Sequence, residues 1–372
     1  MTIRTRFSAF LSAFLPAFTA AALALPAPAQ ADGVADFYQN KRITMLISAA
    51  PGPAYDLFGR LLANHMGRHI PGTPAFLPRN MPGAGGMVAL NYAYTQGARD
   101  GTLIFTLHIA LPLQQVLGQK GVRFDANKLI GLGRLSAGNT VTGAWHTTGI
   151  TSYKDLFERE LLVGGGQATS NTTMFPTVAQ NMFGMKIRVI AGYKSLSEQM
   201  LAMERGEIKG LGSISLVTLE NWKKGYLADK RFVPLFQWGL AREKDLPNIP
   251  VVGELAKNPL DRKAIEVLAS QMDLGRSFFM PPGVPADRVA ALRKAFDATV
   301  KDPAFLAEAK KTNSDIIYAS GPDMEKVIDG VLSAPPEAIA RLKQAMLQRS
   351  GGRCEEYSSA KSCAKKKKKK KN

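Results

Sequence analysis

Two short segments near the N-terminus place small residues directly before the expected start of a helix. They are residues 48–56, SAAPGPAYD, and residues 79–86, RNMPGAGG. A helix N-terminus exposes up to four backbone N–H groups without intrahelical partners and about half a positive charge. Small residues leave these groups uncovered, so a carboxylate or phosphate can bind there without a dedicated cationic side chain. Two such segments indicate that the protein binds an anion.

Two further segments of this kind lie in the second half of the chain. Residues 164–172, GGGQATSNT, and 192–197, GYKSLS, bring glycines, hydroxyls and an amide to expected helix starts. Ser, Thr and Asn are also the ordinary N-cap residues, so any one segment can be only a turn and a cap. Ligands bind at the carboxyl ends of strands in open parallel sheets, and four equivalent segments therefore favour a cleft with donors on both walls.

Short apolar runs alternate with amphipathic stretches along the chain, a pattern that predicts α/β architecture with parallel sheets covered by helices. We expect strands over residues 43–47, 102–107, 160–163, 186–190, 208–211 and 277–280, and the chain runs through residues 232–238 before a loop with several prolines. We expect helices over residues 56–67, 171–183, 195–205 and 261–270, and after Pro285, Pro303, Pro322 and Pro335. The alternation restarts near residue 150, which predicts two α/β units.

The N-terminal segment has the composition of a secretory signal peptide. Arg4 and Arg6 precede an apolar stretch over residues 7–25, and Ala-Gln-Ala at 29–31 provides a small-residue cleavage site. Pro16 interrupts the apolar stretch, which favours cleavage over a retained membrane anchor. We therefore expect a mature periplasmic protein that begins after this site.

The net charge of +18 is divided unevenly along the chain. The signal peptide carries two net positive charges and residues 351–372 carry seven, which leaves nine on the body. A basic body attracts small anions, although a solvated lysine-rich surface accounts for the same charge. The body has no arginine-rich run and no interleaved aromatic and basic residues, so we expect no nucleic-acid partner.

Residues 350–372 lack apolar periodicity and are expected to form a disordered Lys-rich tail. Both cysteines, Cys354 and Cys363, lie in this segment, so the body has no disulfide framework. The lysine run can contact anionic lipids, or it can be an extension without a role in ligand binding.

The sequence gives little support for catalysis. His65 and His69 have helical i, i+4 spacing, but Met66 stands where a zinc-protease motif needs glutamate, and we expect a partly exposed helix face. A Gly-x-Ser-x-Gly elbow and a phosphate loop are absent, and the glycines at 164–166 do not complete a dinucleotide fingerprint. We expect no enzyme activity, no cofactor and no metal.

An ordered series of motifs resembles the extracytoplasmic substrate-binding proteins of tripartite tricarboxylate transporters, also called Bug-type receptors. These motifs lie at residues 38–47, 50–52, 55–56, 80–86, 192–194, 201–207, 246–250, 281–285 and 301–305. The resemblance covers nearly all of residues 36–347 and implies a type II periplasmic-binding fold, in which two α/β lobes enclose a small carboxylate. We expect the chain to cross the hinge twice, near residues 140–148 and 265–276.

The resemblance also implies domain limits and binding residues. Residues 1–31 are then the signal peptide, 32–143 with 272–349 form lobe 1, 144–271 form lobe 2, and 350–372 form the tail. By position, the family's ligand loops in lobe 1 correspond to Ala50, Gly52, Ala54, Tyr55, Asp56, Gly83, Ala84 and Gly85. Those of lobe 2 correspond to Thr169, Ser170, Asn171, Tyr193, Lys194, Ser195, Ser213 and Ser215.

Individual side chains have roles that follow from their chemistry. Asp56 is acidic, so we expect it to cap the helix and order the loop amides, with contact to a ligand ammonium or hydroxyl as the alternative. Lys194 can form a charge-assisted bond to a carboxylate or be a surface lysine. Tyr55 can close the pocket or pack between helices, and His108 can donate to the ligand or be structural. Pro53 replaces a glycine that is usual in the family and removes one N–H donor.

These features predict a periplasmic receptor that closes two lobes around a mono-, di- or tricarboxylate and delivers it to a membrane permease. The resemblance implies a permease with one large and one small subunit, and a receptor that works as a monomer. Two alternatives stay open: a ligand sensor that signals to a membrane receptor, and a secreted enzyme acting on small carboxylates. The partner distinguishes the first alternative, and turnover of the ligand distinguishes the second.

Overall fold

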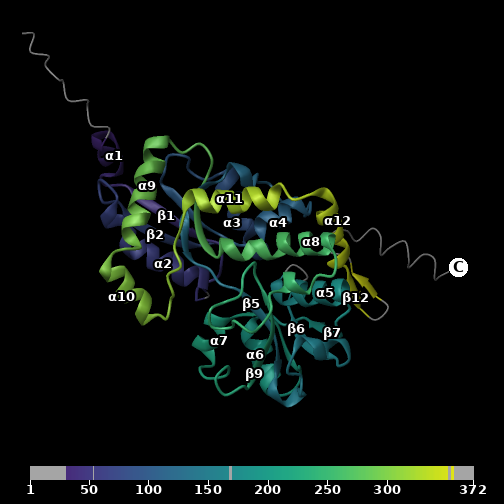
Figure 1. The fold of residues 1–372 in the computed structure, drawn as a ribbon. Helices are drawn as coiled ribbons and strands as arrows, with labels where there is room; N and C mark the ends of the chain where they lie inside the picture. Colours follow the sequence, from purple (N-terminus) through teal and green to yellow (C-terminus); the bar gives the residue numbers. More distant parts are fainter. Residues whose placement is uncertain (1–30, 53, 167–169, 351–352, 356–372) are drawn as a thin grey trace, which may run out of the picture.

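The computed structural model describes residues 31–52, 54–166, 170–350 and 353–355. Residues 1–30 of the predicted signal peptide, Pro53, Thr169 and the lysine run lie outside the described residues. The described residues form two lobes, each built on a sheet that is covered by helices (Figure 1). This architecture confirms the predicted α/β class and its two units.

The first lobe contains a six-stranded sheet in the order β11-β4-β10-β3-β1-β2. Its strands are β1 (Arg42–Ile47), β2 (Ala75–Asn80), β3 (Leu103–Leu107), β4 (Ile130–Ser136), β10 (Arg276–Met280) and β11 (Ala319–Ser320). Its helices include α1 (Ala31–Tyr38), α2 (Ala54–Met66), α3 (Met87–Thr95), α4 (Leu111–Val116), α9 (Ala286–Thr299), α10 (Pro303–Lys311) and α11 (Gly321–Leu332). The 3-10 turn η2 (Ala84–Gly86) leads into α3.

The second lobe contains a five-stranded sheet in the order β7-β6-β8-β5-β9. Its strands are β5 (Thr140–Trp145), β6 (Leu161–Gly165), β7 (Ile187–Ala191), β8 (Gly210–Ser215) and β9 (Phe232–Trp238). Its helices are α5 (Asn171–Phe183), α6 (Leu196–Glu204) and α7 (Leu216–Trp222).

Both sheets are mixed, which corrects the prediction of parallel sheets. Strands β1, β2 and β3 are parallel, as are β6, β7 and β8, and these are the strands joined by helical crossovers. Strand β5 comes directly after the first crossing between the lobes, and β10 follows α8 after the return crossing. Each of the two strands runs antiparallel to its neighbours. An apolar run predicts that a strand forms, but it does not predict the direction of that strand in its sheet.

The chain crosses between the lobes earlier than the sequence predicted. Strand β4 ends in the first sheet at Ser136 and β5 begins in the second at Thr140, so the expected limit after residue 143 falls inside β5. The return crossing follows β9, because the next long helix, α8 (Pro259–Ser270), packs against α11 and α12 (Pro336–Ala345). Figure 1 shows α8 lying beside α11. Residues 259–271, assigned to lobe 2, therefore pack with lobe 1.

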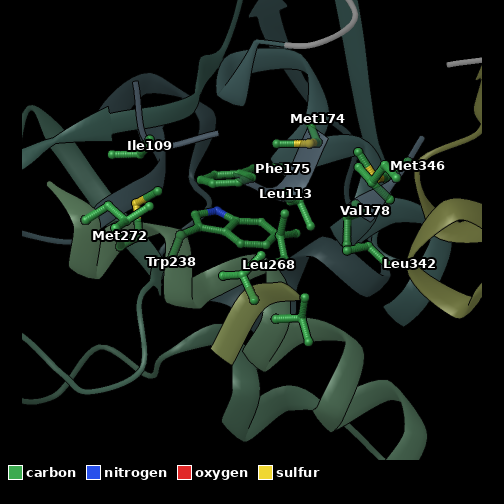
Figure 2. Close-up of a cluster of buried hydrophobic side chains, with 14 of the residues drawn as sticks. Ile109, Leu113, Met174, Phe175, Val178, Trp238, Leu268, Met272, Leu342 and Met346 are labelled. Carbon is green, nitrogen blue, oxygen red and sulfur yellow. The ribbon is translucent and has the colours of Figure 1, made fainter. Parts of the chain in front are cut away.

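A continuous apolar cluster joins the two lobes on the side of these helices. Trp238 at the end of β9 is fully buried and stacks on Phe175 of α5, with 4.3 Å between ring centroids. Figure 2 shows Leu113, Leu268 and Met272 around this ring pair. The cluster contains residues of both sheets and of α8 and α12, so the two lobes share one core.

The C-terminal helix α12 also contacts the second lobe directly. It packs against α5, and Asn181 Nδ2 of that helix donates to the backbone oxygens of Ala345 at 2.8 Å and Leu347 at 2.6 Å. The chain therefore connects the lobes at its two crossings and through this helix.

A short hairpin follows α12. Strand β12 (Gln348–Ser350) pairs antiparallel with β13 (Arg353–Glu355), so the prediction of disorder is wrong for residues 353–355. The backbone hydrogen bonds of a strand pair need no apolar periodicity. Gly351-Gly352 between two short segments is a sequence signal for such a hairpin.

None of the described helices combines the length and the apolar character that a membrane-spanning helix needs.

Replacement of Phe175 by alanine tests the shared core. We expect F175A to lower the free energy of unfolding by about 3–5 kcal/mol, because it leaves a cavity against Trp238. Phe157 is 39% exposed, and F157A should change stability by less than about 0.5 kcal/mol. Chemical denaturation followed by circular dichroism measures both. A loss below about 1 kcal/mol in F175A would show that the stacked pair does not stabilise the core.

Candidate functional site

A cavity of about 700 Å³ lies between the lobes and is lined by residues of both. Its volume is within the range of about 300–1,000 Å³ that is typical of small-molecule sites. The wall from the first lobe comes from the starts of α2 and α4, the end of β3 and the start of β10. The second lobe contributes the starts of α5, α6 and α7 with the loops before them.

Ten of the predicted binding residues line this cavity. They are Tyr55, Gly85, His108, Ser170, Asn171, Tyr193, Lys194, Ser195, Ser213 and Ser215. Six others do not line it, namely Ala50, Gly52, Ala54, Asp56, Gly83 and Ala84. The segments after the strands are thus brought together as expected, but only one edge of each early loop reaches the cavity. Whether these residues bind a ligand remains a prediction.

Thirteen other lining residues were not predicted from the sequence. They are Ile109, Gln114, Gly138, Thr140, Gly166, Thr172, Gly192, Leu196, Gln199, Ile214, Thr218, Met272 and Arg276. Gly166, Thr172, Gly192 and Leu196 lie inside the predicted segments 164–172 and 192–197. Gly138 and Thr140 line the cavity because the chain crosses the hinge at that point, earlier than predicted.

The first early loop is ordered by the acid that follows it. Asp56 is buried, and its carboxylate accepts bonds from Gly52 N–H at 2.9 Å, Asn80 Nδ2 at 2.8 Å and Arg60 Nε at 2.9 Å. Burial raises the pKa of Asp56, but the bonds from Asn80 and Gly52 and the charge of Arg60 outweigh burial, so the pKa lies below its ordinary value. This is the arrangement expected of a residue that orders the loop. The start of α2 therefore already holds a carboxylate of the protein, which opposes a second anion there.

The second early loop reaches the cavity because it lies very close to the end of β3. Gly86 has φ +88°, and a Cβ at this position would lie 2.9 Å from His108 Cβ. A side chain at residue 86 would push the loop away from this strand. Glycine at this position therefore places Gly85 and His108 in one wall.

An aromatic pair and a guanidinium form the wall of the first lobe. The Tyr55 and His108 rings stack with 5.1 Å between centroids, and the Tyr55 hydroxyl accepts the Ile109 N–H at 3.1 Å. Arg276 Cζ lies 5.6 Å from the centre of the Tyr55 ring. Burial, followed by the charge of Arg276, lowers the pKa of His108 to about 4, so the imidazole is neutral at pH 7. Burial also raises the pKa of Tyr55.

Arg276 is a cation that forms no ion pair with the described residues. Its Nε is buried and has no hydrogen-bond partner among the described residues, and the ion pairs of this part of the chain do not include it. Gly275, at φ +49°, precedes it, and a Cβ there would lie 2.0 Å from Ser136 O. This close approach of the end of β4 to the start of β10 fixes the start of β10, and with it the position of Arg276.

The wall of the second lobe is rich in hydroxyl groups at helix starts. Ser195 and Ser215 cap α6 and α7, accepting backbone N–H bonds from Glu198 and Thr218 at 3.2 Å each. Lys194 lies directly before α6 and its side chain is exposed. Lys194 and Arg276 are the only charged side chains among the described lining residues, and both are cationic.

His65 near the end of α2 and His69 in the 3-10 turn η1 (Gly67–His69) after it have a structural role. His65 is buried, and its Nε2 lies 2.7 Å from Glu308 Oε2, while His69 Nε2 lies 2.9 Å from Asp302 Oδ2. The expected exposed helix face is therefore wrong for His65, because α10 and its N-cap cover this side of α2. No group of three potential metal ligands occurs within the described ranges.

Solved structures with this architecture exist among periplasmic proteins. A TctC solute-binding protein from Polaromonas aligns with a TM-score of 0.61 at 17% identity, over 82% of this chain and 98% of that chain. The periplasmic binding protein BugD aligns with a TM-score of 0.59 at 18% identity, over 83% and 98%. MatC from Rhodopseudomonas palustris, solved with bound malate, aligns with a TM-score of 0.57 at 14% identity, over 82% and 99%.

The chain has the fold of these solute-binding proteins. The predicted two-lobe periplasmic-binding fold is therefore confirmed. No protein-family model matches the chain, and no curated protein matches it.

The buried imidazole makes a testable contribution to the pH dependence of this fold. The pKa of His108 is about 4 in the folded protein against an ordinary value of 6.5. Between these pH values the unfolded chain binds a proton that the folded chain does not, so folding loses stability as the pH falls from about 6.5 to 4. We expect H108Q to lose less stability than wild type over this interval, by up to about 3 kcal/mol.

The measurement is the free energy of unfolding at several pH values for wild type, H108Q and a control, H146Q. His146 is exposed, and H146Q should follow the wild-type curve. Parallel curves for wild type and H108Q would contradict a neutral, buried imidazole in the cavity wall.

Proposed function

We propose that the protein is a periplasmic receptor that captures a small organic anion between its lobes and delivers it to a membrane permease. The observation that carries this proposal is the charge of the cavity wall. Arg276 and Lys194 contribute positive charge from the two lobes, and the described lining residues include no carboxylate.

The environment of Arg276 is the physical reason to expect an anion. Desolvation of a charge is costly unless a partner compensates it, and the described part of the chain provides no carboxylate to this guanidinium. A guanidinium matches a carboxylate with two parallel N–H···O bonds. A ligand carboxylate would therefore gain a strong, directional bond and neutralise the wall.

The arrangement of the lobes supports capture by closure. Wall residues come from both lobes, so a ligand that contacts both stabilises a closed arrangement, as in hinge-bending receptors. The likeness to MatC with bound malate supports a carboxylate ligand. The signal peptide indicates work outside the cytoplasm. The resemblance of the motifs indicates a monomeric receptor and a permease with one large and one small subunit.

Replacement of Arg276 tests the proposal. A ligand at 100 times its dissociation constant stabilises the protein by about 2.7 kcal/mol, which a thermal-shift assay detects. We expect R276Q to weaken binding of the stabilising anion roughly 30-fold or more, because loss of one partner of a buried charge pair costs about 2–5 kcal/mol. The control is R262Q, which alters an exposed arginine of α8. Equal binding by R276Q and wild type would contradict the role of this cation.

The ligand itself separates the receptor from the alternatives. The purified protein is screened against mono-, di- and tricarboxylates, amino acids and phosphate, and any co-purified compound is identified by mass spectrometry. We expect a stabilising carboxylate that is recovered unchanged after incubation. Recovery of a converted product would favour the enzyme. Co-purification with a signalling receptor instead of a permease would favour the sensor.

A further inference from the structure

Two buried glutamine side chains line the cavity, one from each lobe. Gln114 on α4 is 4% exposed and Gln199 on α6 is 2% exposed. The Oε1 atom of each is buried without a hydrogen-bond partner among the described residues. A third cavity amide, Asn171 at the start of α5, has a buried Oδ1 in the same condition.

A buried carbonyl oxygen without a donor is destabilising, so these amides require N–H or O–H groups to face them. A carboxylate does not meet this need, because at neutral pH it only accepts hydrogen bonds. This need for hydrogen-bond donors is independent of Arg276, whose guanidinium needs an acceptor. The cavity wall therefore favours a ligand that carries both an anionic group and hydrogen-bond donors.

Two of the wall hydroxyls donate to other hydroxyls of the second lobe. Ser213 Oγ donates to Thr140 Oγ1 at 3.0 Å, and Ser215 Oγ donates to Thr218 Oγ1 at 2.7 Å. These hydroxyl hydrogens are already used within the second lobe. The amide oxygens of Gln114 and Gln199 depend on other donors.

We propose that the ligand is a hydroxylated carboxylate, whose carboxylate binds Arg276 and whose hydroxyl groups donate to Gln114 and Gln199. This inference rests on the proposed function for its anionic part and adds the substrate class. Because the two glutamines belong to different lobes, the hydroxyl groups of one ligand bridge the cavity. Such a ligand favours the closed arrangement more than an unsubstituted acid does.

Matched pairs of acids test this proposal on the wild-type protein. Hexanoate and gluconate are six-carbon monocarboxylates without and with hydroxyl groups, and adipate and galactarate are the corresponding dicarboxylates. Isothermal titration calorimetry gives the four dissociation constants, with sorbitol as the uncharged polyol. We expect the hydroxylated member of each pair to bind about 10- to 100-fold more tightly, and sorbitol to bind more weakly than gluconate.

The outcomes separate this proposal from the proposed function. Equal or tighter binding of hexanoate and adipate would overturn the hydroxyl requirement and leave anion capture in place. Binding of sorbitol as tight as that of gluconate would overturn the carboxylate at Arg276. Failure of gluconate and galactarate to bind would overturn the hydroxylated ligand, whereas failure of every anion in the wider screen would overturn anion capture.

Two variants test whether the glutamines cause the preference for hydroxylated acids. Q114L and Q199L replace each carboxamide by an apolar group of similar size, and we expect each to reduce the gluconate-to-hexanoate preference about tenfold while hexanoate binding is retained. Q39L, at an exposed glutamine after α1, is the control and should keep the wild-type preference. An unchanged preference in both cavity variants would contradict the proposed contacts. If either variant fails to fold, the dissociation constants of the matched acids for the wild-type protein test the proposal.

Discussion

The shared apolar core around Trp238 is the constraint on which the rest of the structure depends. The indole is fully buried between the lobes, stacks on Phe175 and donates its Nε1–H to Thr142 Oγ1 at 2.9 Å. Helices α8 and α12 pack around the same cluster, so the relative position of the two sheets is determined by close packing as well as by the crossing segments. The cavity lies between lobes that are held together at this core, and an opening motion must pivot about it.

The regions of the cavity wall differ in their charge and in their hydrogen-bonding groups. Asp56 neutralises the start of α2 and orders the loop without lining the cavity. Among the residues that the structure describes, the positive charge of Arg276 has no ion-pair partner beside a neutral His108, and buried amide oxygens of both lobes have no hydrogen-bond donor. A single ligand with complementary groups can satisfy all of these positions. The helix starts of the second lobe then act mainly as a rigid, hydroxyl-lined wall.

Many helices and strands were predictable because they depend mainly on local sequence patterns. The sequence pattern predicted α5 over 171–183 with the bounds that the structure has, and the prolines indicated the C-terminal helices. Strand direction and the hinge crossings were not predictable, because they depend on which sheet a strand joins. Arg276 appears in the sequence as an ordinary residue at the start of an apolar strand. Gln199 did leave a signal, as a polar residue on the apolar face formed by Leu196, Met200 and Met203.

The most direct measurement is a crystal structure of the protein with the small molecule that co-purifies with it or stabilises it best. The account predicts an anion between the lobes, with its carboxylate within hydrogen-bond distance of the Arg276 guanidinium. A ligand bound elsewhere on the molecule, or an Arg276 side chain paired with a carboxylate of the protein itself, would contradict it.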